Sequence, residues 1–233
     1  KIDNHAITPR NGKTVELNAL WYNALKIMAR LAEKYENKQL CRKYLEMAEK
    51  TKKSFDEKFY NEEKHCLYDV LGDSKVRPNQ LFALSLSHPI VDNAEIAEQV
   101  LNTVENKLLN RYGLQTLSSD EEGYVDVYEG SAYKRDSSYH QGITWPWLLG
   151  LYYDALKNTM IIEKNRTKRQ ELEEKITKLV YTTKETFKAE MFERSSIGTI
   201  SEIYDSTEPY EERGAFAQAW SVAEIFRIVL NKR

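Results

Sequence analysis

The spacing of apolar residues constrains this chain most, because it follows the period of an α-helix over most of the length. Apolar side chains recur three or four positions apart between residues 17 and 35, which predicts a long helix. Thr14 precedes this segment as a candidate N-cap, and Glu16 lies in the first turn, where a carboxylate is favourable. The expected apolar stripe consists of Leu17, Leu20, Trp21, Ala24, Leu25, Met28, Leu31, Ala32 and Tyr35.

The same period continues along the chain and predicts about seven helices. The further long ones are expected over residues 40–59, 97–108 and 172–191, and shorter ones near 78–86, 146–157 and 214–230. Strand signals are weak, and only residues 66–70 suggest one arm of a short hairpin. We therefore expect an all-α fold of antiparallel helix pairs in a single domain, 1–233. Residues 110–143 form the longest stretch expected to be non-helical, and loops of that length are often functional.

Composition excludes several classes of protein. Hydrophobic residues make up 41% of the 233, which suffices for a core, and the formal net charge of -2 leaves no basic footprint for nucleic acid. No apolar run approaches the ~18 residues of a membrane helix, and no secretory leader is visible. Two cysteines do not make a disulfide scaffold. We expect a cytoplasmic protein without a nucleic-acid or membrane partner.

Four stretches stand out from the predicted helices because they concentrate polar, charged and aromatic residues. They are "TPRNGKTVELNALWYNAL" (8–25), "VRPNQ" (76–80), "RDSSYHQGITWPW" (135–147) and "GTISEIYD" (198–205) with "RGAFAQAW" (213–220) after it. Amides and charged groups of this kind bind sugar hydroxyls, and aromatic rings stack on the C–H faces of a sugar. The first two stretches also suit plain helix starts with solvent-facing polar residues, since Pro78 fits a first turn.

The chemistry of these stretches excludes other enzyme classes. His140 has no second histidine or cysteine at a zinc-binding spacing, and the chain has no phosphate-binding loop or nucleophile elbow. Glu202 is a candidate acid or base, because it stands between apolar residues in a loop. Inverting glycoside hydrolysis needs two carboxyl groups about 6.5–9.5 Å apart across the sugar. Asp205 follows only three residues further on, and the residues alone leave the partner of Glu202 open.

These stretches, together with "LQTLSS" (114–119) and in this order, resemble the C-terminal glucosidase domain of glycogen debranching enzymes, the amylo-α-1,6-glucosidase type. The resemblance covers residues 1–227. It implies an (α/α)6 barrel, in which twelve helices form two rings and the active site lies among loops at one end. It also implies removal of α-1,6-linked glucose from trimmed glycogen branches by inversion, without metal or organic cofactor, and with glycogen or an α-glucan oligosaccharide as partner.

The resemblance assigns roles to individual residues. Glu202 corresponds to the general base, and Asp205 is expected to orient the Glu202 loop rather than react. Substrate contact is implied for Asp136, His140, Gln141 and Trp145 in the third stretch, and for Glu16, Asn18, Arg77, Asn79 and Trp220 in the others.

The chain also departs from the family pattern. The family's general acid is the Asp of a T-W-M-D motif, which the 233 residues lack; Asp3 lies near the corresponding place without the Trp. About seven helices instead of twelve imply an incomplete toroid, the C-terminal part of the barrel. One alternative is an inactive glucan-binding or self-associating module, whose open face a second copy or an N-terminal partner would cover. Another is a different (α/α)6 sugar hydrolase, such as a trehalase-like enzyme.

Overall fold

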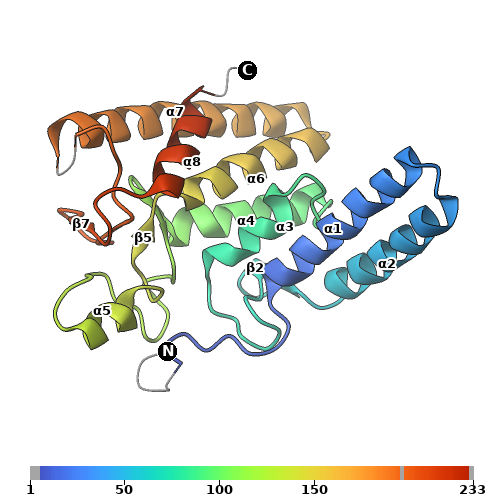
Figure 1. Cartoon of the computed structure of the whole chain (residues 1–233), viewed down its shortest axis with the longest axis horizontal. Coiled ribbons are helices and arrows are strands. Elements are labelled where there is room, and N and C mark those ends of the chain that lie inside the picture. The colour runs from blue at the N-terminus through green and yellow to red at the C-terminus, as the bar shows by residue number, and fades with distance from the viewer. Residues whose placement is uncertain (1–5, 195–196, 231–233) are drawn as a thin grey trace.

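The computed structural model describes residues 6–194 and 197–230, so Asp3 lies outside the described residues. This part of the chain forms eight α-helices, one short 3-10 helix and seven strands of two or three residues (Figure 1). Helices dominate, as the sequence predicts, and the number expected was one too low. None of the described helices is long and apolar enough to cross a membrane.

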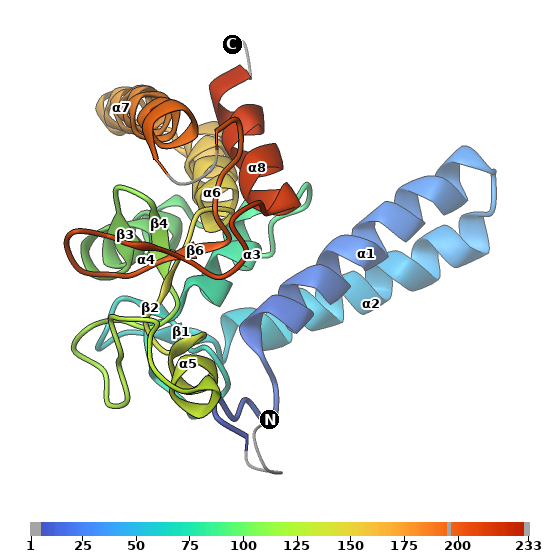
Figure 2. The ribbon, with the colours of Figure 1, turned by 60° about the vertical axis from the view of Figure 1, so that its left-hand side comes forward.

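Two long helices form an antiparallel hairpin at one side of the molecule. Helix α1 spans Val15–Lys34 and α2 spans Lys38–Asp56, with the side chain of Asn37 capping α2 by accepting the N–H of Leu40 at 3.0 Å. Figures 1 and 2 both show this pair standing to one side of the other helices. Thr14 occupies the N-cap position of α1, although its side chain makes no capping hydrogen bond.

The buried face of α1 differs from the expected stripe. Of the expected stripe only Leu25 and Ala32 are buried; the other buried residues of α1 are Val15, Ala19, Tyr22 and Ala29, which the stripe did not include. Leu17, Trp21 and Met28 of the expected stripe are 62%, 51% and 42% exposed. The helix has apolar residues on two faces, and within the described residues only one face packs, against α2, α3 and the 3-10 helix.

The remaining helices pack around α6, which spans Leu148–Ile162 and contacts α3, α4, α7 and α8. The 3-10 helix η1, Pro78–Leu81, leads directly into α3, Phe82–Ser85, so the short helix expected near 78–86 is confirmed. The others are α4 (Ala94–Lys107), α7 (Arg166–Glu193) and α8 (Ala219–Leu230). A Cβ on Gly150 would lie 1.6 Å from Glu224 Oε2, so glycine lets α8 approach α6 closely.

A small antiparallel sheet, which the sequence did not predict, connects the loops at one end of the helices. Its strands are β3 (Leu109–Asn110), β4 (Gly113–Gln115), β5 (Thr144–Trp145), β6 (Ile203–Tyr204) and β7 (Glu212–Arg213), in that order across the sheet. Leu114 pairs with Trp145, and Thr144 pairs with Tyr204. The sheet therefore joins two of the polar stretches, 135–147 and 198–205 with 213–220, to the start of "LQTLSS". A separate hairpin pairs β1 (Tyr60–Asn61) with β2 (Cys66–Leu67), where a hairpin arm was expected.

Two further expectations are corrected. The stretch 110–143 contains a helix, α5 (Ala132–Ser138), whose N-cap is Ser131. This helix is seven residues long and largely polar, so it lacks the apolar period that would predict it. The last helix begins at Ala219 rather than near Gly214, because Gly214 has a left-handed backbone (φ 70°) and the segment before Ala219 wraps around Glu202.

Candidate active site

Glu202 lies directly before β6 with its carboxylate held by three donors. Oε1 accepts the Tyr139 hydroxyl at 2.5 Å and the Gln218 side-chain amide at 3.3 Å, and Oε2 accepts the backbone N–H of Ala215 at 3.0 Å. The backbone N–H of Glu202 in turn donates to the Ala215 carbonyl at 2.8 Å. The residue is half-buried, so solvent reaches a carboxylate whose orientation is fixed. This combination suits a group that exchanges a proton with a bound water.

The neighbours of Glu202 are specialised for this arrangement. A Cβ on Gly214 would stand 2.4 Å from Glu202 Oε2, so only glycine fits beside the carboxylate. Burial, and then the hydrogen bond to Glu202, raise the pKa of Tyr139 well above its ordinary value. Tyr139 therefore stays a neutral phenol at physiological pH and donates its O–H to Glu202.

Asp205 holds the loops around Glu202, which is the orienting role expected from the sequence. Its side chain is almost fully buried: Oδ1 accepts the backbone N–H of Tyr128 at 2.7 Å, and Oδ2 accepts Nη2 and Nε of Arg213 at 2.8 and 3.0 Å. The carboxylate thus connects the end of β6 to β7 and to the loop before α5. With both oxygens occupied, Asp205 has a structural role.

An aromatic cluster stands beside Glu202. The Trp145 ring is buried, stacks on His140 at 5.5 Å between centroids and meets Trp220 edge-on at 5.7 Å. Trp145 Nε1 donates to the carbonyl of Tyr139 at 3.2 Å, which ties the cluster to the residue that holds Glu202. Trp220 stacks on Trp147 and remains 44% exposed. Trp220 therefore presents an aromatic surface to solvent, whereas Trp145 supports the wall from within.

A polar cavity of about 300 Å³ adjoins His140, and the charged residues that line it are Arg10 and Arg77. Arg77 is 6% exposed: Nη1 donates to the carbonyls of Thr116 and His140 at 3.0 and 2.8 Å, and Nη2 donates to Gln141 Oε1 at 2.6 Å. Burial lowers the pKa of Arg77, and that of His140 is lowered by burial and by the charge of Arg77. His140 is consequently neutral at pH 7 and able to accept or donate a hydrogen bond.

Arg10 lines this cavity and Asp69 lies behind it, hydrogen-bonded to Arg10 and Asn79, and neither was predicted as a site residue. Asp69 is 2% exposed and accepts Arg10 Nε and Nη2 at 2.5 and 3.0 Å, and Asn79 Nδ2 at 2.8 Å. Arg10 also donates to both oxygens of Glu16 at 2.6 Å. Burial opposes the charge of Arg10, but the hydrogen bonds to Glu16 and Asp69 outweigh it and raise the pKa. A single acid in the apolar stretch 66–70 was the available signal for Asp69.

A profile of the amylo-alpha-1,6-glucosidase family matches residues 1–227 of this sequence. The chain belongs to that family. Membership indicates a glycoside-hydrolase type of protein, and it confirms the resemblance carried by the polar stretches.

Solved structures similar to this amylo-alpha-1,6-glucosidase family chain support the helical fold. One described as a sialidase has a TM-score of 0.66 at 14% identity, covering 96% of this chain and 20% of that one. An uncharacterized conserved protein from Thermus thermophilus has 0.62 at 14%, covering 94% and 46%. A GH63 mannosylglycerate hydrolase from the same organism has 0.60 at 13%, covering 94% and 45%. The chain spans from a fifth to just under half of these structures, and at such identities they show the fold alone.

Most of the residues that the family resemblance points to meet at one place. His140, Arg77 and Asn79 line the cavity. Gln141 accepts a hydrogen bond from Arg77, and Glu16 accepts one from Arg10. Trp145 and Trp220 belong to the aromatic cluster.

Two of them lie elsewhere. Asn18 donates to the carbonyl of Thr14 one turn back in α1 at 2.7 Å, and Asp136 is exposed on α5. The structure places neither of them among the residues that line this cavity.

Proposed function

We propose that this chain carries the water-activating part of an α-glucosidase that hydrolyses α-1,6-linked glucose at the branch points of an α-glucan with inversion. The observation that carries the proposal is the placement of Glu202 in a member of the amylo-alpha-1,6-glucosidase family. Its half-exposed carboxylate is fixed by three neutral donors, and one of them, Tyr139, packs against Trp145 of the aromatic cluster and against His140, which lines the polar cavity. These are the parts needed to orient one sugar ring and one water.

In the proposed mechanism Glu202 is the general base. It removes a proton from a water that attacks the anomeric carbon on the face opposite the leaving oxygen, so the configuration at that carbon inverts. Tyr139, Gln218 and Ala215 hold the carboxylate in one orientation, and the remaining lone pair, on Oε2, is left for the water. His140, Arg77 and Asn79 bind sugar hydroxyls, and the exposed ring of Trp220 stacks on a sugar face.

The general acid must be a carboxyl group that holds a proton, and the carboxylates at the cavity do not suit this task. Both oxygens of Glu16 accept hydrogen bonds from Arg10, and both oxygens of Asp69 accept from Arg10 or Asn79. Carboxylates that accept from a guanidinium have no proton to donate. The proposal therefore assigns the acid to the T-W-M-D motif of the family, which the 233 residues lack.

Hydrolysis of α-D-glucosyl fluoride tests the role of Glu202 without requiring the acid, because fluoride departs with little protonation. We expect fluoride release, with β-glucose as the first product detected by NMR, and a loss of at least a hundredfold in Glu202→Gln. Glu211→Gln, an exposed carboxylate in the same segment, is the matched control and should retain the activity. Release that survives Glu202→Gln, release of α-glucose first, or no release by the wild type would each refute the proposed mechanism.

One observation supports a second candidate, a module that associates through its apolar surface. Leu17, Trp21 and Met28 lie on one side of α1 and are all more than two-fifths exposed. Such a face is typical of an interface. Light scattering tests self-association directly: a concentration-dependent mass that Trp21→Glu abolishes would support this candidate, and a monomer at all concentrations would count against it.

A further inference from the structure

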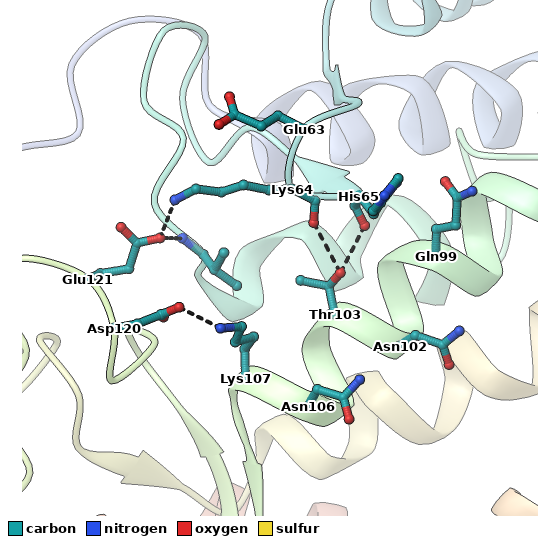
Figure 3. Close-up of a pocket in the computed structure, with 11 residues that line it drawn as sticks. Glu63, Lys64, His65, Gln99, Asn102, Thr103, Asn106, Lys107, Asp120 and Glu121 are labelled. Atoms are coloured by element: carbon teal, nitrogen blue, oxygen red, sulfur yellow. Dashed lines mark hydrogen bonds and ion pairs between the residues drawn. The ribbon is translucent and has the colours of Figure 1, made fainter.

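A second cavity, here called the α4 pocket, has a volume of about 540 Å³ and shares no lining residue with the cavity beside Arg77. It lies between α4, the turn of the β1–β2 hairpin and the segment that follows "LQTLSS" (Figure 3). Its size falls in the range of about 300–1,000 Å³ that is usual for small-molecule sites. The mechanism proposed above uses none of its residues.

Three amide side chains line one side of this pocket. Gln99, Asn102 and Asn106 follow one another along α4 at spacings of three and four residues, which places them on one face (Figure 3). The oxygen of Gln99 accepts the Tyr60 hydroxyl, and the oxygen of Asn102 accepts Lys175 Nζ at 3.1 Å. These bonds orient the two amides and leave their N–H groups as donors.

The charges opposite the amides are paired with one another. Lys64 Nζ lies 2.7 Å from Glu121 Oε1, and Lys107 Nζ lies 2.5 Å from Asp120 Oδ2 (Figure 3). Paired ammonium groups do not favour a phosphate or another anion. The carboxylates of Asp120 and Glu121 are engaged in these pairs, Glu63 is an exposed carboxylate among the lining residues, and no group of three potential metal-binding side chains occurs among the described residues. The pocket thus suits a neutral ligand rich in hydroxyl groups.

The turn that closes the pocket is held in a strained conformation. The Thr103 hydroxyl donates to the carbonyls of His65 and Lys64 at 3.0 and 3.3 Å, which fixes the turn over α4 (Figure 3). His65 has φ 50°, in the left-handed region that residues other than glycine rarely adopt. Such strain persists only where surrounding contacts impose it, and it is found at ligand clamps. The exposed His65 ring therefore stands at a defined place on the rim.

We infer that the α4 pocket is a second binding site for an α-glucan chain, separate from the site at Glu202. Amide N–H groups that donate, a hydroxyl oxygen that can accept and charges that are already paired are suited to bind neighbouring hydroxyl groups of a sugar. The choice of an α-glucan as the ligand rests on the proposed function, because an enzyme that acts on a branched glucan is surrounded by many copies of the same linear chain. A second site would keep the polymer attached while one branch is trimmed.

Titration of the ¹⁵N-labelled protein with maltoheptaose tests this inference, with the side-chain amide signals of Asn102 and Asn106 as probes. These signals should shift and saturate, and glycerol at the same hydroxyl concentration should not move them. The double variant Asn102→Ala/Asn106→Ala should bind maltoheptaose about tenfold more weakly at this site, because two hydrogen bonds are lost. Binding to this variant is measured from the shifts of the His65 signals. Gln170→Ala, an exposed amide on α7, is the matched control.

The outcomes separate this inference from the proposed function. The double variant should hydrolyse α-glucosyl fluoride at the wild-type rate, and Glu202→Gln should bind maltoheptaose at the α4 pocket unchanged. Saturable binding without any fluoride hydrolysis would refute the proposed function and leave the second site standing. Absence of saturable shifts at Asn102 and Asn106, equal shifts with glycerol, or unchanged affinity in the double variant would overturn the second site.

Discussion

Glu190 should make the stability of this protein fall as the pH rises toward neutrality. The residue lies on α7, is 3% exposed, and accepts the Tyr204 hydroxyl at 2.8 Å. Its nearest cation, Arg194 Nε, is 3.6 Å away and lies closer, at 2.8 Å, to Glu212. Burial and the neighbouring Glu212 raise the pKa of Glu190 to about 7, against the opposing effects of Tyr204 and Arg194.

The magnitude follows from the difference between the folded and unfolded states. A carboxyl group with an ordinary pKa of 4.5 in the unfolded chain and about 7 in the folded one binds its proton more tightly when folded. The protonated form contributes its full stability below pH 4.5, and that contribution is lost as the pH rises to about 7. One pKa unit corresponds to about 1.4 kcal/mol, so the loss is about 3 kcal/mol.

Urea unfolding at several pH values measures this effect. Glu190→Gln removes the titration, so we expect the free energy of unfolding of the variant, relative to wild type, to increase by about 3 kcal/mol between pH 4.5 and 8. Glu185→Gln, an exposed carboxyl group on the same helix, should follow the wild type. Parallel pH curves for the wild type and Glu190→Gln would show that Glu190 ionises normally and would refute the reasoning.

Three further substitutions test the surroundings of Glu202 and of the polar cavity. Tyr139→Phe removes the 2.5 Å hydrogen bond to Glu202, worth about 1.5–3 kcal/mol for a charged acceptor, and should lower kcat for α-glucosyl fluoride about tenfold or more with little change in KM. Gly214→Ala should reduce the same rate strongly, because its Cβ collides with the carboxylate; Gly198→Ala has a similar left-handed backbone without neighbours within 4 Å and should lose only about 1–2 kcal/mol of stability. Asp69→Asn should lower the free energy of unfolding by about 2–3 kcal/mol, measured with urea, since the half-buried Arg10 guanidinium loses its buried charged partner and keeps only Glu16. Equal rates for the two glycine variants, a wild-type rate in Tyr139→Phe, or unchanged stability in Asp69→Asn would contradict these arguments.

The sequence predicts the helices better than the faces they bury. Periodicity locates α1, α2, α4, α6 and α7, because each is long enough to repeat the apolar pattern several times. For α1 the pattern does not decide which of two apolar faces is buried: Ala19 packs inside while Trp21 is exposed. The choice depends on which helices lie next to α1, and that information is not local to its sequence.

The small sheet and the role of Asp69 behind the cavity were not predicted either, because neither leaves a local pattern in the sequence. Strands of two or three residues, such as Thr144–Trp145, are too short to show alternation. The importance of Asp69 arises from Arg10 and Asn79, which lie 59 and 10 residues away in the chain. The polar stretches, by contrast, could be proposed as site-forming segments from the sequence, since amides, charges and aromatic rings concentrated there are visible without knowing the fold.

Environment, rather than position in the sequence, separates the roles of the three carboxylates that surround β6. Asp205 is buried and paired with Arg213, so it is committed to holding the sheet. Glu190 is buried, and its nearest cation, Arg194, lies closer to Glu212, so burial raises the pKa of Glu190 and favours its protonated form. Among the described residues, Glu202 is half-exposed, has no ion-pair partner and is fixed by neutral donors. An unpaired, oriented and solvent-accessible carboxylate is what water activation requires, and of these three only Glu202 meets all the conditions.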